Sequence, residues 1–495
     1  MIFKAISNSY CQHTRRNCIG HLKDHLQLHI QVPVINSVQY SSSAASVFAL
    51  LLFSQRLTRV STPLISQIRG HQHSDSKSEH SDKEDSKEPE VMPKPSISEA
   101  LKKAKTEAAW GLFVADSLAM PVHWYYNPDD IVSDYGSWLK GYIAPNAKHP
   151  SSILRLSAVD GSGRGSTSSS NSLIGSVILH DKLKYWNGSA SSNHYHQGMK
   201  AGDNTLNAVM ALHEMQTMNR VDHDLIKPER DVRGAVLADY VSFMTTPGSH
   251  NDTYAESFHR AFFKDWVPAG EPKTEEEILE FAETRSKEMM KGRPDSQLAV
   301  IGSLVPAIPW VIRNAHKSEK ECAQSVVDFV KLTHPVPSLI QFVDTYARLL
   351  HAVINGKDLK AEVLRVLSHS ILGGPANRDK ILQILDSAES IPRGTEERLE
   401  LYQIMTGRLG SACYIEGALS SLLFLALEFH NDFEGGVLAN ANCGGENCHR
   451  GAALGALLAA SAVNHGSEVP AKLKDGLHSL KGGIEVAVKE MNEGF

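Results

Sequence analysis

Apolar residues recur every three or four positions through most of this chain. In the first clear case they fall on one face of a helix, at Leu101, Ala104, Ala108, Leu112, Ala115 and Ala119. The same period appears over residues 204–217, 230–245, 274–292, 296–314, 319–333, 337–354, 377–389, 411–429, 451–464 and 479–491. Few stretches alternate with the two-residue period of strands. The pattern predicts an all-α fold.

Two regions, 140–200 and 247–275, show neither period and are expected to carry irregular loops that set specificity. The first includes a Ser/Gly-rich segment, 161–170, which we interpret as a surface excursion. The folded body is expected to begin at Ser96, because Ser96 and Glu99 have the spacing of a helix capping box. This assigns residues 96–495 to one all-α domain.

The first 95 residues have a different composition. Residues 1–70 contain seven Lys or Arg and a single acid, Asp24, which is typical of a mitochondrial transit peptide. A poorly ordered extension of a cytoplasmic protein is the alternative. The apolar run 44–53 is too short for a membrane span, which needs roughly 20 residues. Residues 71–95 are charged and Ser-rich and are predicted to form a disordered linker.

The net charge of -6 is unevenly distributed, since residues 1–70 sum to +6 and the remainder to -12. A body this acidic offers no basic face for phosphate backbones, so neither a nucleic acid nor a membrane is expected as a partner. The six cysteines form no regular framework of pairs, which fits a reducing compartment.

Two polar segments stand directly before helical patterns. One is Asp203-Asn204-Thr205, whose side-chain oxygens are ligands of the kind that Mg²⁺ prefers. Asp203 also suits a helix N-cap, which is the purely structural interpretation. The other is Gly444-Gly445-Glu446, where the glycines favour a turn and Glu446 is placed favourably at a helix start. The small residues that follow, over 451–464, allow that helix to pack deep in the body.

These segments resemble motifs of the ADP-ribosylglycohydrolase (ADP-ribosylation/crystallin J1) family. Asp203-Asn204-Thr205 is similar to the family's Thr-Asp-Asp-Thr, and residues 444–449 are similar to its Gly-Gly-Asp-x-Asp-Thr. Residues 111–124, Thr333-His334-Pro335 and Gly410-Ser411-Ala412 match three further segments in the same order and spacing. The resemblance covers about residues 100–465.

The resemblance implies a compact multi-helix domain with a central cleft that holds one or two Mg²⁺ ions. It also implies hydrolysis of the bond between ADP-ribose and an ADP-ribosylated protein or a small ADP-ribosyl molecule. Glu446 and Asp203 would be catalytic. The implied metal ligands are Asp203, Asn204, Thr205, Glu446, Cys448, His449 and His123. The implied substrate-binding residues are His334, Gly302, Ser303, Gly444 and Gly445. Asp116 is interpreted as structural.

The chain departs from the family at several ligand positions. His123, Asn204, Cys448 and His449 stand where the family usually has Glu, Asp, Asp and Thr. Three alternatives follow: a hydrolase with a single Mg²⁺, a site for Zn²⁺ or another transition ion, or a site without activity in an ADP-ribose-binding or crystallin-like structural protein. The second would draw on His123, Cys448 and His449, joined by His194 or His196.

Overall fold

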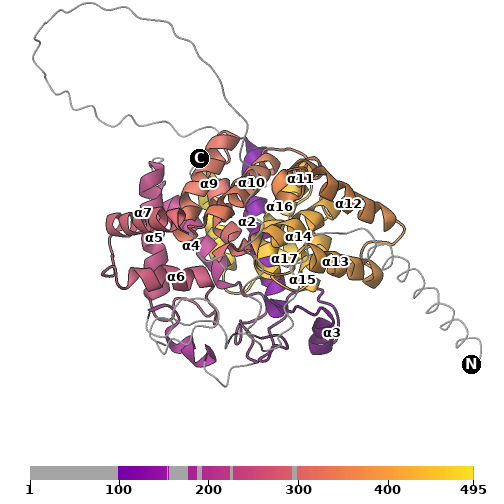
Figure 1. Cartoon of the computed structure of the whole chain (residues 1–495), viewed down its shortest axis with the longest axis horizontal. Helices are drawn as coiled ribbons and strands as arrows, with labels where there is room; N and C mark the ends of the chain where they lie inside the picture. The colour runs from indigo at the N-terminus through magenta and orange to yellow at the C-terminus, as the bar shows by residue number, and fades with distance from the viewer. Residues whose placement is uncertain are drawn as a thin grey trace, which may run out of the picture. The chain divides into compact units, whose positions relative to one another are not determined.

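The computed structural model describes residues 98–152, 154, 177–186, 192–222, 227–292 and 298–493. The chain divides into two compact units, Met1–Ser86 and Lys87–Phe495, and the described residues belong to the second. Within the described ranges the regular structure is helical and contains no named strand, only the isolated bridges Lys148–Asn193 and Val300–Tyr414. The all-α prediction is therefore confirmed (Figure 1).

The α-helices follow one another through the unit. They are α2 (Glu99–Ala119), α3 (Asp129–Tyr135), α4 (Leu206–Val221), α5 (Glu229–Thr245), α6 (Ser257–Trp266), α7 (Glu275–Lys291), α8 (Leu304–Asn314), α9 (Glu319–Thr333), α10 (Pro337–Ile354), α11 (Leu359–Leu367), α12 (Gly374–Ser387), α13 (Glu396–Leu409), α14 (Ile415–Glu428), α15 (Phe433–Asn442), α16 (Asn447–Asn464), α17 (Ala471–Asp475) and α18 (Lys481–Glu493). Short 3₁₀ turns lie at Met120–Val122, His180–Trp186, Ile301–Ser303 and Ser370–Leu372.

The prediction that Ser96 and Glu99 form the capping box of the first helix was wrong. Helix α2 begins at Glu99 with Ser98 as its N-cap, and the Ser98 hydroxyl accepts the Leu101 amide hydrogen at 3.2 Å. Ser96 lies outside the described residues. The expectation of irregular structure over 247–275 also needs correction, because α6 occupies Ser257–Trp266.

Helices α2 and α16 cross at the centre of the unit through small residues. A side chain added at Gly111 would overlap the carbonyl oxygen of Gly455, and one at Gly455 would overlap that of Gly111. The backbones can lie this close only because both positions lack a Cβ atom. Nearly the whole length of α16 is buried, and α10 and α14 pack beside it (Figure 1).

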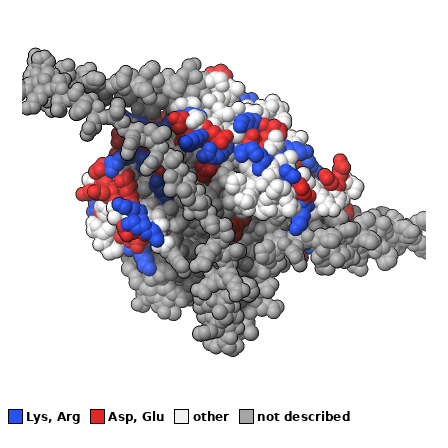
Figure 2. All heavy atoms as spheres, turned by 45° about the horizontal axis from the view of Figure 1, so that its top comes forward, with Lys and Arg blue, Asp and Glu red and all other residues white. Residues whose placement is uncertain are grey.

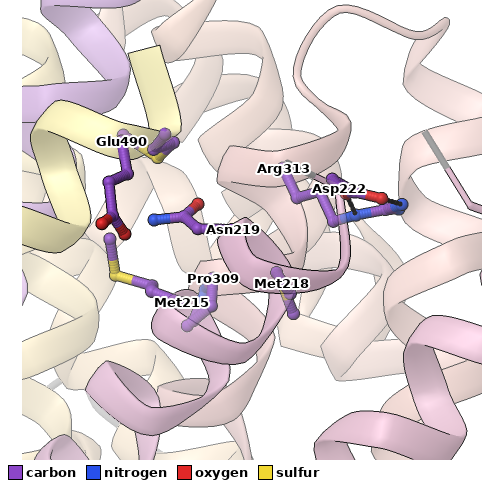
Figure 3. A pocket seen from close by; sticks show the side chains of 8 residues that line it. Met215, Met218, Asn219, Asp222, Pro309, Arg313 and Glu490 are labelled. Carbon is purple, nitrogen blue, oxygen red and sulfur yellow. Dashed lines mark hydrogen bonds and ion pairs between the residues drawn. The ribbon is translucent and has the colours of Figure 1, made fainter. Parts of the chain in front are cut away.

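Helices α4, α5, α7 and α9 gather on one side of this central pair, and α11 to α14 gather on the other (Figure 1). Helix α8 packs against α4 and α9 and also contacts the central pair. Where α18 meets α4 and α8, a cavity of about 20 Å³ is lined by Met215, Met218, Asn219 and Glu490 (Figure 3). At its edge Arg313 Nε donates to Asp222 Oδ2 at 2.8 Å, which ties α8 to the end of α4.

Basic and acidic side chains are interspersed on the face that Figure 2 shows. Among the described residues, no helix has the length and apolar character needed to cross a membrane.

Candidate active site

Two turns that are distant in the sequence are locked together at the base of the site. After α2, the chain turns at Trp124, whose φ of 65° is unusual for a residue with a bulky side chain. The Trp124 amide donates to Gly445 O at 2.7 Å, and the Gly445 amide donates to Tyr125 O at 2.8 Å. Gly444 and Gly445 have φ values of 62° and 63°, and a Cβ on either would overlap a backbone carbonyl. The glycines therefore permit this close contact between the turns.

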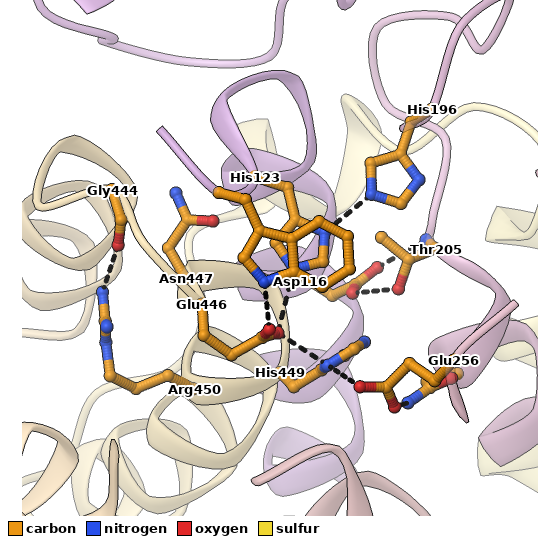
Figure 4. Close-up of polar contacts among 12 residues, drawn as sticks. Asp116, His123, His196, Thr205, Glu256, Gly444, Glu446, Asn447, His449 and Arg450 are labelled. Carbon is orange, nitrogen blue, oxygen red and sulfur yellow. Dashed lines mark hydrogen bonds and ion pairs between the residues drawn. The ribbon is translucent and has the colours of Figure 1, made fainter. Parts of the chain in front are cut away.

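Glu446 lies at the centre of the cluster that these turns create (Figure 4). Its Oε1 lies 2.9 Å from His123 Nε2 and 2.7 Å from His449 Nδ1. Its Oε2 accepts a hydrogen bond from Trp124 Nε1. All of these side chains are buried. Both carboxylate oxygens of Glu446 are thus held by nitrogen groups.

A second carboxyl group, that of Glu256, lies on the other side of His449. Glu256 Oε1 is 3.5 Å from His449 Nδ1, and its Oε2 accepts a hydrogen bond from Asn207 Nδ2 at 2.6 Å. A Cβ on Gly302 would overlap Glu256 Oε2, so this glycine makes room for the carboxyl. His449 therefore stands between two buried carboxyl groups.

A row of imidazoles extends from Glu446 toward α4. His123 Nδ1 lies 2.7 Å from His196 Nε2, and His196 Nδ1 lies 2.8 Å from Asp252 Oδ1. Asp252 Oδ2 also accepts the Leu206 amide hydrogen at 2.8 Å, so this carboxylate caps α4 as well. The row places Asp252, His196, His123 and Glu446 in direct succession.

Burial and neighbouring charges together set the protonation of this cluster. Burial works against charge on His449, yet the carboxylates of Glu256 and Glu446 raise its pKa to about 10. Burial also disfavours the Glu446 carboxylate, but His123 and His449 hold the pKa of Glu446 well below its usual range. Burial raises the pKa of Glu256 and lowers that of His123 to about 3. Two nearby carboxyl groups thus have pKa values displaced in opposite directions.

The side chains of Asp203, Asn204 and Thr205 form hydrogen bonds with residues outside the cluster around Glu446. Asp203 Oδ1 accepts hydrogen bonds from His478 Nδ1 at 2.9 Å and from the Ser479 hydroxyl, and its Oδ2 accepts the Lys200 amide hydrogen at 2.8 Å. Thr205 Oγ1 donates to Asp116 Oδ1 at 2.6 Å. Asn204 Nδ2 donates to Asp116 Oδ2 at 3.0 Å, while Asn204 Oδ1 accepts no hydrogen bond from the described residues. Asp203 does not cap α4, whose N-cap is Thr205.

The residues expected to bind substrate are buried. His334 Nδ1 is 2.8 Å from the Thr333 hydroxyl, and its Nε2 has no hydrogen-bond partner in the described part of the chain. The Ser303 hydroxyl donates to Val300 O at 2.7 Å. The amides of Gly445 and Glu446 are already donated to Tyr125 O and Ser411 O. These two amides are therefore not available to a phosphate group.

Three members of the cluster were not predicted from the sequence. Asp252 and Glu256 lie in the region expected to be irregular, where no periodicity marked them. Trp124 lies in the segment 111–124, which resembles a family motif, but no role was predicted for this residue. A role for Trp124 could have been inferred, because the N–H group of a buried indole usually donates a hydrogen bond to a polar group.

The donor atoms around Glu446 do not fit Mg²⁺. This ion takes six oxygen ligands in near-octahedral geometry. Of the predicted oxygen ligands, Asp203 and Thr205 are engaged elsewhere, and Glu446 is surrounded by nitrogen groups. Two groups of side chains in the described residues have ligand atoms within 4.8 Å of one another: His123, His196 and Cys448, and His123, Glu446 and His449. Nitrogen and sulfur dominate both groups.

Comparison with known proteins supports one family. A family model described as ADP-ribosylglycohydrolase matches residues 98–495. Among solved structures 45 chains match, including one described as an ADP-ribosylglycohydrolase-related protein complex. That chain is 15% identical with a TM-score of 0.42, and the alignment covers 80% of this chain and 98% of the other. No curated protein matches.

Proposed function

Because the chain belongs to the ADP-ribosylglycohydrolase family, we propose that it hydrolyses the glycosidic bond of an ADP-ribosylated protein or a related ADP-ribosyl conjugate. The observation that carries the proposal is that Glu446 and Glu256 approach the same nitrogen of His449, Nδ1, at 2.7 Å and 3.5 Å. Glycosidic bonds are commonly hydrolysed by a pair of carboxyl groups in different protonation states.

The two carboxyl groups would have different tasks. The Glu446 carboxylate, fixed by Trp124 and His123, would stabilise the positive charge that develops at the anomeric carbon, orient the attacking water and take up the proton that this water loses. Glu256 would supply the proton that the leaving group needs, with its carboxyl oriented by Asn207. The imidazolium of His449 would balance the charge of the Glu446 carboxylate.

Replacement of Glu446 tests this assignment. Glu446→Gln removes the charge and changes little volume, so we expect kcat to fall by about 10²–10⁴-fold while the fold persists. The measurement is release of free ADP-ribose by the full-length chain from a mixed pool of ADP-ribosylated proteins, with thermal unfolding recorded for each variant. The matched control is Glu396→Gln, at an exposed position of α13. Unchanged turnover in Glu446→Gln would remove Glu446 from the mechanism.

A second function, binding of ADP-ribose without turnover, is favoured by one observation. Both oxygens of Glu446 are already occupied by His123, His449 and Trp124, which leaves the carboxylate poorly placed to act as a base. This alternative predicts micromolar binding of ADP-ribose by calorimetry with no product, and loss of that binding in His334→Ala. The absence of any heat with ADP-ribose, ADP or NAD would exclude it.

A further inference from the structure

The row Asp252–His196–His123–Glu446 has an unusual centre. In each imidazole the outer nitrogen lies beside a carboxylate, at 2.8 Å for His196 Nδ1 and 2.9 Å for His123 Nε2. The two inner nitrogens, His196 Nε2 and His123 Nδ1, face each other at 2.7 Å. The rings are nearly parallel, with an interplanar angle of 4°.

The number of N–H groups does not match the number of contacts. A neutral imidazole carries a single N–H group. If both rings donate outward to Asp252 and Glu446, both inner nitrogens present lone pairs to each other. Two lone pairs at this separation repel unless a proton or a metal ion lies between them. Either one satisfies both nitrogens and leaves both outward hydrogen bonds intact, so the neighbouring side chains must distinguish the two cases.

Cys448 supplies a third ligand for such an ion. Its sulfur lies within 4.8 Å of the ligand atoms of His123 and His196, and its side chain is fully buried in the first turn of α16. We propose that His123, His196 and Cys448 bind a zinc-class transition ion, a site that is distinct in its donor set from a magnesium site. Two imidazole nitrogens and one thiolate suit Zn²⁺ and leave a fourth position for water or substrate.

Metal binding requires both imidazole rings to turn, because their inner nitrogens face each other at 2.7 Å with ring centroids 5.0 Å apart, whereas a tetrahedral ion is approached from two different directions. Zinc binds histidine nitrogen at about 2.0–2.1 Å in a tetrahedral arrangement, which separates two nitrogen ligands by about 3.4 Å. The inner nitrogens must therefore move apart from 2.7 Å by a fraction of an ångström. The outer carboxylates already occupy the place of the groups that orient metal-bound histidines in zinc proteins.

The group His123, Glu446 and His449 is the competing location, and it shares His123 with the first. We favour the first group because Glu446 already receives hydrogen bonds from Trp124 and His123, which makes it the orienting partner of His123. The inference concerns the same buried cluster as the proposed hydrolase but does not depend on its substrate.

The test measures metal content and spectrum in the full-length chain, with no activity assay. Protein produced without added metal is dialysed against Zn²⁺ and then against buffer, and elemental analysis is expected to find about one equivalent of zinc per chain. Co²⁺ in place of Zn²⁺ is expected to give a thiolate-to-cobalt charge-transfer band. Cys448→Ser should lose that band, while the matched control Cys443→Ser, which alters another buried cysteine, should keep it. Asp252→Asn should weaken zinc binding by about 10–100-fold.

Three outcomes would overturn the proposal. Zinc-free wild-type protein that also takes up no Co²⁺ would mean that a shared proton, not a metal, joins the two imidazoles. A cobalt band that persists in Cys448→Ser would exclude the thiolate ligand. Loss of zinc in Glu446→Gln together with retention in Cys448→Ser would move the ion to the competing group. Conversely, retained zinc in Glu446→Gln supports the site whether or not that variant turns over, so failure of the hydrolase proposal is separately visible.

Discussion

Glu214 is a buried acid that forms no ion pair with any residue in the described ranges. It lies on α4 beside a cavity of about 20 Å³ that Asn207, Tyr240 and His259 also line. Its Oε2 has no hydrogen-bond partner among the described residues. Burial, with a smaller contribution from Asp239, raises the pKa of Glu214 well above its usual range. The folded protein therefore binds the Glu214 proton more tightly than the unfolded chain does.

This predicts a specific pH dependence of stability. The contribution of Glu214 is fully present below the unfolded pKa, about 4.3, and is lost as pH rises through the raised folded pKa. Glu214→Gln has nearly the same shape and cannot ionise, so we expect it to be more stable than wild type at pH 8 by about 1–3 kcal/mol, with a smaller difference at pH 5. Urea unfolding at the two pH values measures this.

The control for that experiment is Glu280→Gln, an exposed position on α7. This variant should show the same change in the free energy of unfolding between pH 5 and pH 8 as the wild type. If Glu214→Gln shows the wild-type pH dependence too, another buried group is responsible.

At individual residues the sequence indicated which turns meet better than it indicated the contacts that each side chain makes. The resemblance to the family placed residues near 123 and 446–449 in one site, and in the structure His123, Glu446 and His449 are in contact. The direction of the Asp203 side chain could not be inferred, since His478 and Ser479, which hold it, lie far along the chain. Glu256 and Asp252 carried no local signal, because a buried carboxyl group is defined by its three-dimensional neighbours.

The crossing of α2 and α16 determines where the site residues stand. Helix α2 leads directly to His123, and α16 begins at Asn447, next to Glu446. A methyl group on Gly455 would overlap the Gly111 carbonyl and lie 2.6 Å from the Ala115 Cβ atom. The helices would have to move apart, and both halves of the site would move with them.

We therefore expect Gly455→Ala to lower the free energy of unfolding by about 1–3 kcal/mol, as overpacking does, despite the better helix propensity of alanine. Thermal unfolding is the measurement. Gly482→Ala is the matched control, because this helical glycine in α18 has open space around its Cβ position. The control should be neutral or slightly stabilising. Equal behaviour of the two variants would show that the crossing tolerates a wider separation.

Helices with clear start signals were predicted most accurately. The bounds 319–333 and 337–354 coincide with α9 and α10, where Ser318 forms a capping box and Pro337 occupies the first turn. Helix α13 was missed because its buried side includes Arg398, which donates to Glu428 Oε1 at 2.7 Å in place of apolar packing. Helix α15 was missed because glycine and alanine give little contrast between its faces. The apolar period therefore does not reveal a helix whose buried face consists of polar pairs or of very small side chains.

On the scale of the whole molecule, the family match and the composition divide the chain near the same place. The family model begins at residue 98, and the acid-poor composition is confined to residues 1–70. The proposed hydrolase would act only on conjugates in its own compartment, so a targeting function of the N-terminal segment would decide which substrates it meets. We propose that this segment directs the chain to mitochondria.

A reporter fusion tests that proposal. Residues 1–70 joined to a fluorescent protein are expected to direct it to mitochondria, because a basic, acid-poor segment is drawn toward the negative side of a membrane potential. Replacing Arg15, Arg16 and Lys23 with Glu reverses the local charge and should leave the reporter diffuse in the cytoplasm. Residues 71–97 fused to the same reporter are the control and should not redirect it. A diffuse signal from the unaltered 1–70 fusion would contradict mitochondrial targeting and favour cytoplasmic conjugates as the substrates.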